Sequence, residues 1–217
     1  VSVGAGIGMA MGFVHAGVKT PVIATIGDST FYHAGLPALV NAVQHQTPIT
    51  LIIMDNGWTS MTGFQVNPGT DERFQATGSR RVQIEALVRS LGVDSLQVIR
   101  PFQQEEAVGA LAEALKTRGV RVIIAQEECA LPRARREAPA RIYQIDAAKC
   151  TFCRSCLRET GCPALYVTTA PDPKKGQGAT KNVTAIDPEL CTGCGLCFTC
   201  CKFDAIGEAT GPRSGRR

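Results

Sequence analysis

Two groups of cysteines near the C-terminus carry the strongest chemical signal in this 217-residue sequence. Each group is a C-x2-C-x2-C triplet followed by a further cysteine: Cys150, Cys153, Cys156 with Cys162, and Cys191, Cys194, Cys197 with Cys201. Three thiolates in one short loop suit three irons of a four-iron cluster, and in two-cluster proteins the trailing cysteine binds the other cluster. The spacing therefore predicts two [4Fe-4S] clusters. The first would be held by Cys150, Cys153, Cys156 and Cys201, and the second by Cys191, Cys194, Cys197 and Cys162.

Two other uses of these cysteines need to be weighed. Structural zinc also uses C-x2-C pairs, although a third cysteine at the same spacing is unusual for zinc. Disulfides would indicate a secreted scaffold, but the long cysteine-poor N-terminal part argues against one and favours thiolates in a reducing cytoplasm. Cys200 could compete with Cys201 as a ligand, but its spacing from the triplet fits the cluster pattern less well. We expect Cys200 to be a small buried hydrophobic residue instead. Cys129 stands alone, and we expect it to be a core residue.

A second group of polar residues follows two apolar runs in the N-terminal part. Gly27-Asp28-Ser29 ends one predicted buried strand, and Asp55-Asn56-Gly57 ends the next. The carboxyl ends of parallel strands are where such sheets bind ligands. The Asp28 carboxylate, the Asn56 side-chain carbonyl and a turn carbonyl near Trp58 form an oxygen set that suits magnesium. Taken singly, the two motifs would be explained as a helix N-cap and a turn.

The elements that would position these residues alternate between strands and helices. Hydrophobic periodicity predicts helices over 4–18, 33–46, 82–91 and 103–117, and strands over 22–26, 49–54, 95–99 and 120–125. This alternation predicts an α/β fold with a doubly wound parallel sheet. Amides at the start of the helix over 33–46 could face a diphosphate.

The composition changes after residue 129. We expect a ligand-binding domain over 1–129, an Arg- and Pro-rich linker over 130–141, a small α+β ferredoxin-like domain over 142–208 and a disordered tail over 209–217. Residues 145–153 and 186–194 are two copies of one repeat, and each predicts a strand, a cysteine loop and a short helix. Residues 171–181, between the copies, read as an exposed loop.

Overall composition excludes several classes of protein. The chain is 44% hydrophobic and 19% charged, which suits a packed globular fold. Its net charge of +4 does not by itself indicate nucleic-acid binding. The sequence has no apolar run of membrane-spanning length and no signal-peptide pattern. It begins without Met, inside a Gly-rich apolar stretch, so we expect a piece of a longer polypeptide.

The two strand-end motifs together resemble the thiamine-diphosphate motif, which begins Gly-Asp-Gly and ends with Asn about thirty residues later. Ser29 replaces its third residue. Three stretches, GDSTFYHAGLPAL (27–39), MTGFQ (61–65) and NPGT (67–70), are similar to the large subunit of the indolepyruvate ferredoxin oxidoreductase family. That family also carries two four-iron clusters after its thiamine-binding domain. Lys202 departs from the Pro that commonly follows the fourth cysteine.

The resemblance implies roles for individual residues. Asp28, Asn56 and the Trp58 carbonyl would hold Mg²⁺, with Gly27, Ser29 and Thr62 near the diphosphate. These belong to a thiamine-diphosphate-binding fold. His33 would face the substrate or the thiazolium ring, although a plain position at the helix start explains it equally well.

The resemblance also implies a reaction and partners. An arylpyruvate, with indolepyruvate favoured, would be oxidatively decarboxylated; coenzyme A would take the acyl group, and the clusters would pass electrons to an external ferredoxin. Phenylglyoxylate, pyruvate or a branched-chain 2-oxo acid are alternative substrates. The catalytic carboxylate would lie outside this chain, on an upstream pyrimidine-binding domain, and a smaller second subunit would complete the enzyme. This fragment alone would be inactive. The alternative from another class is an electron-transfer module with a vestigial thiamine domain.

Overall fold

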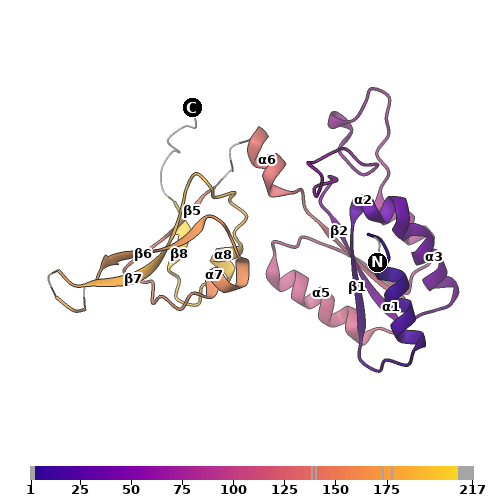
Figure 1. Cartoon of the computed structure of the whole chain (residues 1–217), viewed down its shortest axis with the longest axis horizontal. Coiled ribbons are helices and arrows are strands. Elements are labelled where there is room, and N and C mark those ends of the chain that lie inside the picture. Colours follow the sequence, from indigo (N-terminus) through magenta and orange to yellow (C-terminus); the bar gives the residue numbers. More distant parts are fainter. Residues whose placement is uncertain (1–2, 138, 140, 173, 177, 210–217) are drawn as a thin grey trace. The chain divides into compact units, whose positions relative to one another are not determined.

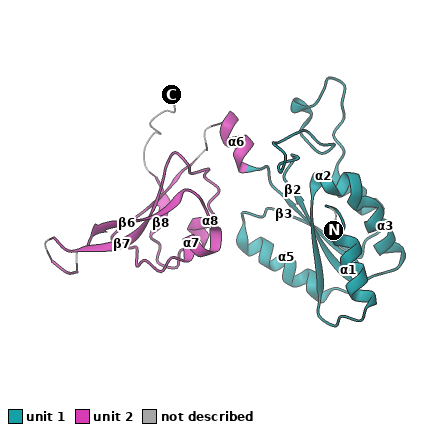
Figure 2. Ribbon diagram, in the orientation of Figure 1, with its two compact units in different colours: residues 1–129 teal, residues 130–217 magenta. Residues whose placement is uncertain are grey.

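A computed structural model describes residues 3–137, 139, 141–172, 174–176 and 178–209 (Figure 1). The chain divides into two compact units, residues 1–129 and 130–217 (Figure 2). Most of the predicted tail, 209–217, lies outside the described residues. No helix in the described part of the chain is both long and apolar enough to cross a membrane.

The first unit is built on a four-stranded parallel sheet. Its strands are β1 (Val22–Gly27), β2 (Ile49–Asp55), β3 (Ser95–Ile99) and β4 (Arg121–Gln126), in the order β1-β2-β4-β3. The four predicted strands are confirmed. Central strands buried on both faces read as continuous runs of Val, Ile and Leu, which is why the sequence signal was clear.

Helices cover both faces of this sheet (Figure 1). Buried side chains of α1 (Gly6–His15), α3 (Leu36–Gln44) and α4 (Ile84–Ser90) form one core with one face of the sheet. Those of α5 (Gln104–Lys116) form a second core with the opposite face. The predicted doubly wound α/β fold is confirmed. A short 3-10 helix, η2 (Glu72–Phe74), lies in the long loop between β2 and α4.

The helix that follows β1 begins earlier than the sequence predicted. It starts directly after Gly27 with α2 (Asp28–Thr30), continues through a π-helical turn, η1 (Phe31–Gly35), and runs on as α3. The prediction of a helix starting at His33 was wrong because Gly-Asp-Ser reads as a turn, whereas Asp28 here forms the first helical turn. The amides at the helix start therefore belong to the Gly-Asp-Ser motif itself, and His33 is an exposed residue of the π-helical turn.

The described residues of the second unit form two antiparallel strand pairs and three short helices. Strand β5 (Tyr143–Ile145) pairs with β8 (Ile206–Glu208), and β6 (Leu165–Pro171) pairs with β7 (Thr180–Ile186). The helices are α6 (Ala130–Arg136), α7 (Ser155–Thr160) and α8 (Leu196–Thr199). The predicted strand, cysteine loop and short helix of each repeat are confirmed.

Two segments of the second unit are more regular than predicted. The expected linker 130–141 contains α6, which forms despite Pro132. The expected loop 171–181 is shorter, because β6 extends to Pro171 and β7 begins at Thr180. Cysteines make up much of the small core: Cys150 and Cys156 are buried in it, and Cys162, Cys197 and Cys201 pack against it.

Candidate functional site

The carboxylate of Asp28 is held at the carboxyl edge of the parallel sheet. Its Oδ1 accepts a hydrogen bond of 2.7 Å from the Ser29 amide, and its Oδ2 accepts one of 2.8 Å from the Gly57 amide. β1 and β2 pair in parallel with Gly27 opposite Met54, so their ends lie side by side. Asp28 is only 2% exposed. The sheet therefore joins the two motifs, which lie 28 residues apart in the sequence.

The turn after β2 places further oxygens beside this carboxylate. The side-chain carbonyl of Asn56 accepts hydrogen bonds from the Trp58 amide (2.9 Å) and the Ser60 hydroxyl (3.3 Å). The Trp58 carbonyl accepts a longer one, of 3.4 Å, from Ser60. A 2.9 Å hydrogen bond from Thr59 Oγ1 to Ser29 Oγ ties this turn to the start of the helix. The structure thus gathers the strand-end motifs into one site.

Two of the predicted site residues lie further out. Thr62 is exposed at the tip of the loop closed by the Thr59–Gln65 bridge, where its hydroxyl donates to Gln65 at 2.5 Å. His33 is exposed on the π-helical turn. Neither has a hydrogen bond to Asp28 in the described structure. Their predicted roles near the diphosphate and the substrate remain predictions.

Asn67 is a site residue that the sequence reasoning missed. Asn67 is 6% exposed, and its Oδ1 accepts a hydrogen bond of 2.8 Å from the Gly69 amide. In the same stretch, Thr70 Oγ1 donates a hydrogen bond of 2.6 Å to the Gly57 carbonyl. The Asn67 Nδ2 is buried without a hydrogen-bond partner in the described residues. The stretch 67–70 carried a signal for this, because a buried Asn before Pro-Gly needs polar partners. Gly57 is thereby held through its amide by Asp28 and through its carbonyl by Thr70.

The electrostatics of the site suit a bound cation. Burial raises the pKa of the Asp28 carboxyl above its usual 3.8, and the nearby charge of Asp55 adds to the rise. The Ser29 amide, the Asn67 side chain and the Gly57 amide act in the opposite direction and lower this pKa. A buried carboxylate whose charge is disfavoured gains from a hard divalent cation, which prefers oxygen ligands. Asp28 and Asn56 therefore fit magnesium.

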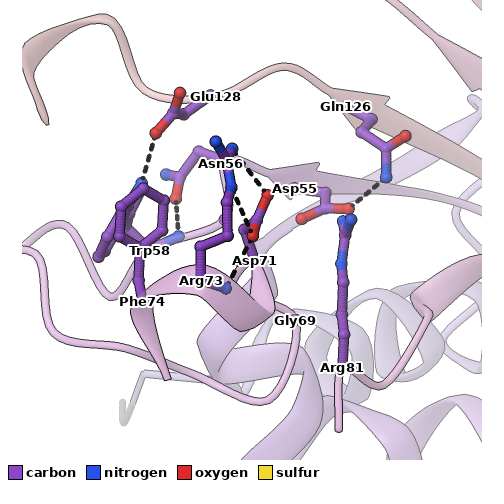
Figure 3. A pocket seen from close by; sticks show the side chains of 11 residues that line it. Asp55, Asn56, Trp58, Gly69, Asp71, Arg73, Phe74, Arg81, Gln126 and Glu128 are labelled. Atoms are coloured by element: carbon purple, nitrogen blue, oxygen red, sulfur yellow. Dashed lines mark hydrogen bonds and ion pairs between the residues drawn. The ribbon is translucent and has the colours of Figure 1, made fainter. Parts of the chain in front are cut away.

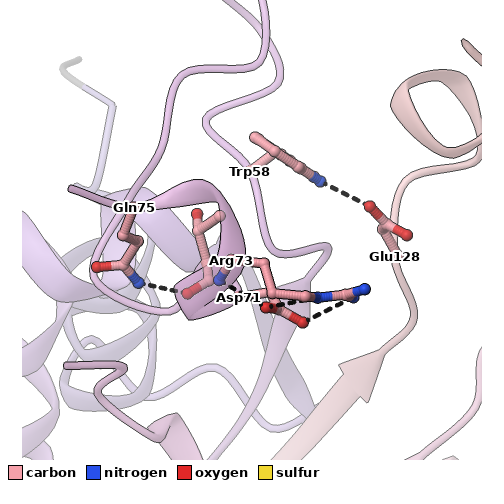
Figure 4. Close-up of polar contacts among 6 residues, drawn as sticks. Trp58, Asp71, Arg73, Gln75 and Glu128 are labelled. Carbon is pink, nitrogen blue, oxygen red and sulfur yellow. Dashed lines mark hydrogen bonds and ion pairs between the residues drawn. The ribbon is translucent and has the colours of Figure 1, made fainter. Parts of the chain in front are cut away.

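A cavity of about 160 Å³ opens beside this site, at the ends of β2 and β4 (Figure 3). Figure 3 shows Arg81 and Gln126 directed at Asp55, and Gln126 Nε2 donates to Asp55 Oδ2 at 2.7 Å. Trp58 closes another side of the cavity, where its indole donates to Glu128 at 3.1 Å (Figure 4). The site thus lies next to a hollow lined by both charges and aromatic rings.

The two cysteine loops of the second unit share one backbone design. Asp146 and Asp187 precede the triplets, and their carboxylates accept from the amides of Ala148 and Glu189, each at 2.8 Å. Their carbonyls accept from the first cysteine of each triplet at 3.0 Å. Positive φ angles occur at equivalent positions, 57° and 60° at Phe152 and Arg154, and 73° and 82° at Gly193 and Gly195. The repeat in the sequence is therefore a repeat in three dimensions.

The strand pairing crosses these two copies. β5, which leads into the first triplet, pairs with β8, which follows Cys201. β7, which leads into the second triplet, pairs with β6, which follows Cys162. One cavity is accordingly lined by the first triplet together with Cys201. Cys197 lies near Cys194, Cys191 and Cys162. Burial, followed by the charges of these cysteines, raises the pKa of the Cys197 thiol to about 12.

The arrangement of the first triplet is compatible with a cluster. Within the described residues, no three His, Cys, Asp or Glu side chains converge closely enough to hold one metal ion. Structural zinc needs four ligands around a single ion, whereas a four-iron cube spreads its thiolates around a larger body. The first triplet and Cys201 share one cavity without converging on a point, as a cube would require.

The extra cysteines differ in their surroundings. Cys200 is buried and lines the first cavity beside Cys201; burial, followed by Glu159, raises its thiol pKa. Cys129 lies in the first unit, where its amide donates to the Asn56 carbonyl at 3.2 Å. Lys202 is exposed next to the last cysteine.

The first unit is a doubly wound sheet with a buried carboxylate at its carboxyl edge, and the second unit carries paired cysteine loops. These features are those of a cofactor-binding α/β protein with a metal-cluster unit. Residues 1–125 match the model of the thiamine pyrophosphate enzyme C-terminal TPP-binding domain. The chain belongs to the thiamine pyrophosphate enzyme family. Residues 183–206 match a 4Fe-4S binding domain.

Curated relatives extend over nearly the whole chain. The indolepyruvate oxidoreductase subunit IorA of Pyrococcus horikoshii is 40% identical over 87% of this chain, and that of Archaeoglobus fulgidus is 38% identical over 96%. The chain spans 28% and 32% of the length of these two relatives.

A solved structure shares the fold. The 2-oxoglutarate:ferredoxin oxidoreductase from Magnetococcus marinus aligns with 58% of this chain and 46% of its own, at a TM-score of 0.50 and 15% identity.

The raised pKa of Asp28 predicts a pH dependence of stability. Because the folded state binds this proton more tightly than the unfolded state, the metal-free protein loses stability as pH rises from 3.8 through the raised pKa. Asp28→Asn has no such proton. We therefore expect the difference in the free energy of unfolding, variant minus wild type, to increase across this window and then level off. Urea unfolding between about pH 4 and about pH 8 measures this difference.

Asp71→Asn serves as the control for this measurement. Hydrogen bonds from Arg73 lower the pKa of Asp71 to about 2, so its contribution is lost only as pH falls through 3.8 toward that value. The difference between Asp71→Asn and wild type should therefore stay nearly constant over most of the measured range. A difference between Asp28→Asn and wild type that does not change with pH would contradict the raised pKa.

Proposed function

We propose that this chain is the cofactor-binding and electron-transfer part of a thiamine-diphosphate-dependent 2-oxo-acid:ferredoxin oxidoreductase. The observation that carries the proposal is that one chain combines two features: a buried carboxylate site, in a domain of the thiamine pyrophosphate enzyme family, and two cysteine triplets, the first of which lines a cavity together with Cys201. The IorA relatives, named as indolepyruvate oxidoreductase subunits, favour indolepyruvate over phenylglyoxylate, pyruvate or a branched-chain 2-oxo acid.

The first unit holds the organic cofactor. Asp28, Asn56 and the Trp58 carbonyl would bind Mg²⁺, and phosphate oxygens and water would complete its coordination. Gly27 and Ser29, at the start of the helix, face the diphosphate. Thiamine diphosphate supplies the nucleophilic carbon at which a 2-oxo acid loses carbon dioxide.

Two exposed residues complete this proposed site. Thr62 approaches the diphosphate from the loop tip, and His33 faces the substrate or the thiazolium ring from the π-helical turn. The turn is a π-bulge, an irregularity that is frequent at functional sites.

The second unit takes up the electrons. Cys150, Cys153, Cys156 and Cys201 hold the first [4Fe-4S] cluster, and the other set of four, Cys191, Cys194, Cys197 and Cys162, holds the second. Oxidative decarboxylation to an acyl-CoA releases two electrons, and two one-electron carriers can each accept one. Coenzyme A receives the acyl group, and an external ferredoxin reoxidises the clusters.

Further parts complete the enzyme. The carboxylate that activates the aminopyrimidine comes from a pyrimidine-binding domain outside this chain, and a smaller second subunit joins the complex. The short share of the relatives that this chain covers leaves room for such a domain. The chain alone is inactive in this proposal, and it acts in the cytoplasm, where thiols stay reduced.

The metal site can be tested by calorimetry on the complete complex. Asp28→Ala should abolish the binding of thiamine diphosphate with Mg²⁺, because the substitution removes the charged ligand. Glu85→Ala, which removes an exposed carboxylate paired with Arg89 outside the cavity, should bind as wild type does. Absence of binding by the wild-type complex would overturn the thiamine assignment and favour a pure electron-transfer module.

The crossed cluster ligands can be tested by two neighbouring substitutions. Anaerobically prepared wild type should contain about eight irons and about eight acid-labile sulfides per chain. Cys201→Ser should lower the iron content or convert the first cluster to a three-iron form seen by EPR, whereas Cys200→Ser should keep both clusters. Loss of a cluster in Cys200→Ser but not in Cys201→Ser would reverse the assignment of these two cysteines.

The substrate can be tested by ferredoxin reduction. In the presence of coenzyme A, the complete complex should reduce ferredoxin fastest when indolepyruvate is the substrate. The substrates for comparison are other arylpyruvates, phenylglyoxylate, pyruvate and branched-chain 2-oxo acids. The ratio of kcat/KM values measures this preference. A higher kcat/KM for pyruvate or a branched-chain acid would assign the enzyme to that substrate.

A further inference from the structure

Thr184, on β7, is a buried donor without an assigned role. It is 2% exposed, and its Oγ1 has no hydrogen-bond partner in the described residues. Leaving a buried hydroxyl unpaired costs about 1–3 kcal/mol, so such a group calls for a partner. Thr184 lines the same cavity as the first triplet and Cys201.

Thr184 shares this cavity with Cys156. A threonine hydroxyl near a thiolate sulfur can donate to it. The buried hydroxyl lies in a cavity otherwise lined mainly by apolar and cysteine side chains, so sulfur is the natural acceptor for its hydrogen.

Lys181, three residues earlier on β7, places a positive charge at the same loop. Its Nζ donates to the carbonyls of Cys150 at 2.9 Å and Ala148 at 3.3 Å, and its side chain is half-buried. Arg158, from α7, donates to the Cys153 carbonyl at 3.3 Å. Two cationic side chains thus bond to the backbone of the first triplet.

The second triplet has different groups at the positions related by the forty-one-residue repeat. The counterpart of Thr184 is Tyr143, whose ring packs on Phe198 at 6.0 Å and whose hydroxyl lies against Gly195 of the second cysteine loop, so the two triplets differ mainly in nearby positive charge. The counterpart of Arg158 is Thr199, whose hydroxyl donates to the Leu196 carbonyl of its own helix at 2.9 Å. The nearest basic residue before this repeat, Arg141, is paired with Glu208 at 3.0 Å.

We propose that Thr184 donates its hydroxyl hydrogen to Cys156 Sγ when the first cluster is bound, and that with Lys181 it makes this cluster the one with the higher reduction potential. This inference rests on the proposed binding of two clusters. Reduction adds one negative charge to a cluster, and hydrogen bonds to its sulfurs and nearby positive charge favour the reduced form. A single electron entering the pair then resides on the first cluster.

The test is a redox titration of the complete complex followed by EPR. Thr184→Val keeps the shape and removes the donor, so it should lower the higher of the two midpoint potentials and leave the lower one unchanged. Thr184→Ser keeps the hydroxyl and should stay close to wild type. Thr169→Val, at an exposed position on the neighbouring strand β6, is the matched control and should change neither potential.

Iron content separates the possible results. If wild type and Thr184→Val both hold about eight irons and the midpoints agree, the inference is overturned while the proposed function stands. If only the lower midpoint falls, Thr184 does not belong to the higher-potential cluster and the inference is overturned as well. If wild type holds no clusters, the proposed function fails and this inference fails with it.

A second variant decides the case in which Thr184→Val loses iron. Lys181→Met keeps the aliphatic stem and removes the charge, so it should lower the same higher midpoint with full iron content. An unchanged midpoint in Lys181→Met would then overturn the inference.

Discussion

In the cysteine-rich unit, the strand that precedes each cysteine triplet pairs with the strand that follows the other triplet. The rest of the unit depends on this crossed pairing. β5 pairs with β8, and β6 pairs with β7, so the strand beside each cysteine loop is held by a strand of the other half. The unit has little apolar core beyond its cysteines and a few aliphatic side chains. Such a small core supplies limited stability, and bound metal commonly supplies the remainder in domains of this size.

The first unit depends on a comparable constraint, the in-register parallel pairing of β1 and β2. This pairing lets one buried carboxylate, Asp28, accept from the amide that begins its own helix and from the amide of Gly57 in the next turn. Burial makes the charge of Asp28 costly, and the same burial gives it a strong preference for a cation. Stability is lowered where a cofactor is to be bound, a common feature of functional sites.

Much of this architecture was predictable from local patterns, and the misses have local causes. Buried parallel strands read as apolar runs, so β1 to β4 were found. The helix start at Asp28 was missed because Gly, Asp and Ser favour turns when tertiary contacts are ignored. Helix α6 was missed because Pro and clustered Arg read as a linker, although Pro is tolerated in a first helical turn.

The sequence by itself determined the two cysteine triplets, the two strand-end motifs and the repeat, because all of these are matters of residue type and short spacing. Only the tertiary structure decided that Cys201 shares a cavity with the first triplet, since the same spacing would also permit each triplet to use its nearer cysteine. Tertiary structure likewise brought Asn67 to Asp28 and the hydroxyl of Thr184 to the cysteine cavity. These neighbours come from distant segments, and strand pairing, which no local pattern encodes, sets them side by side.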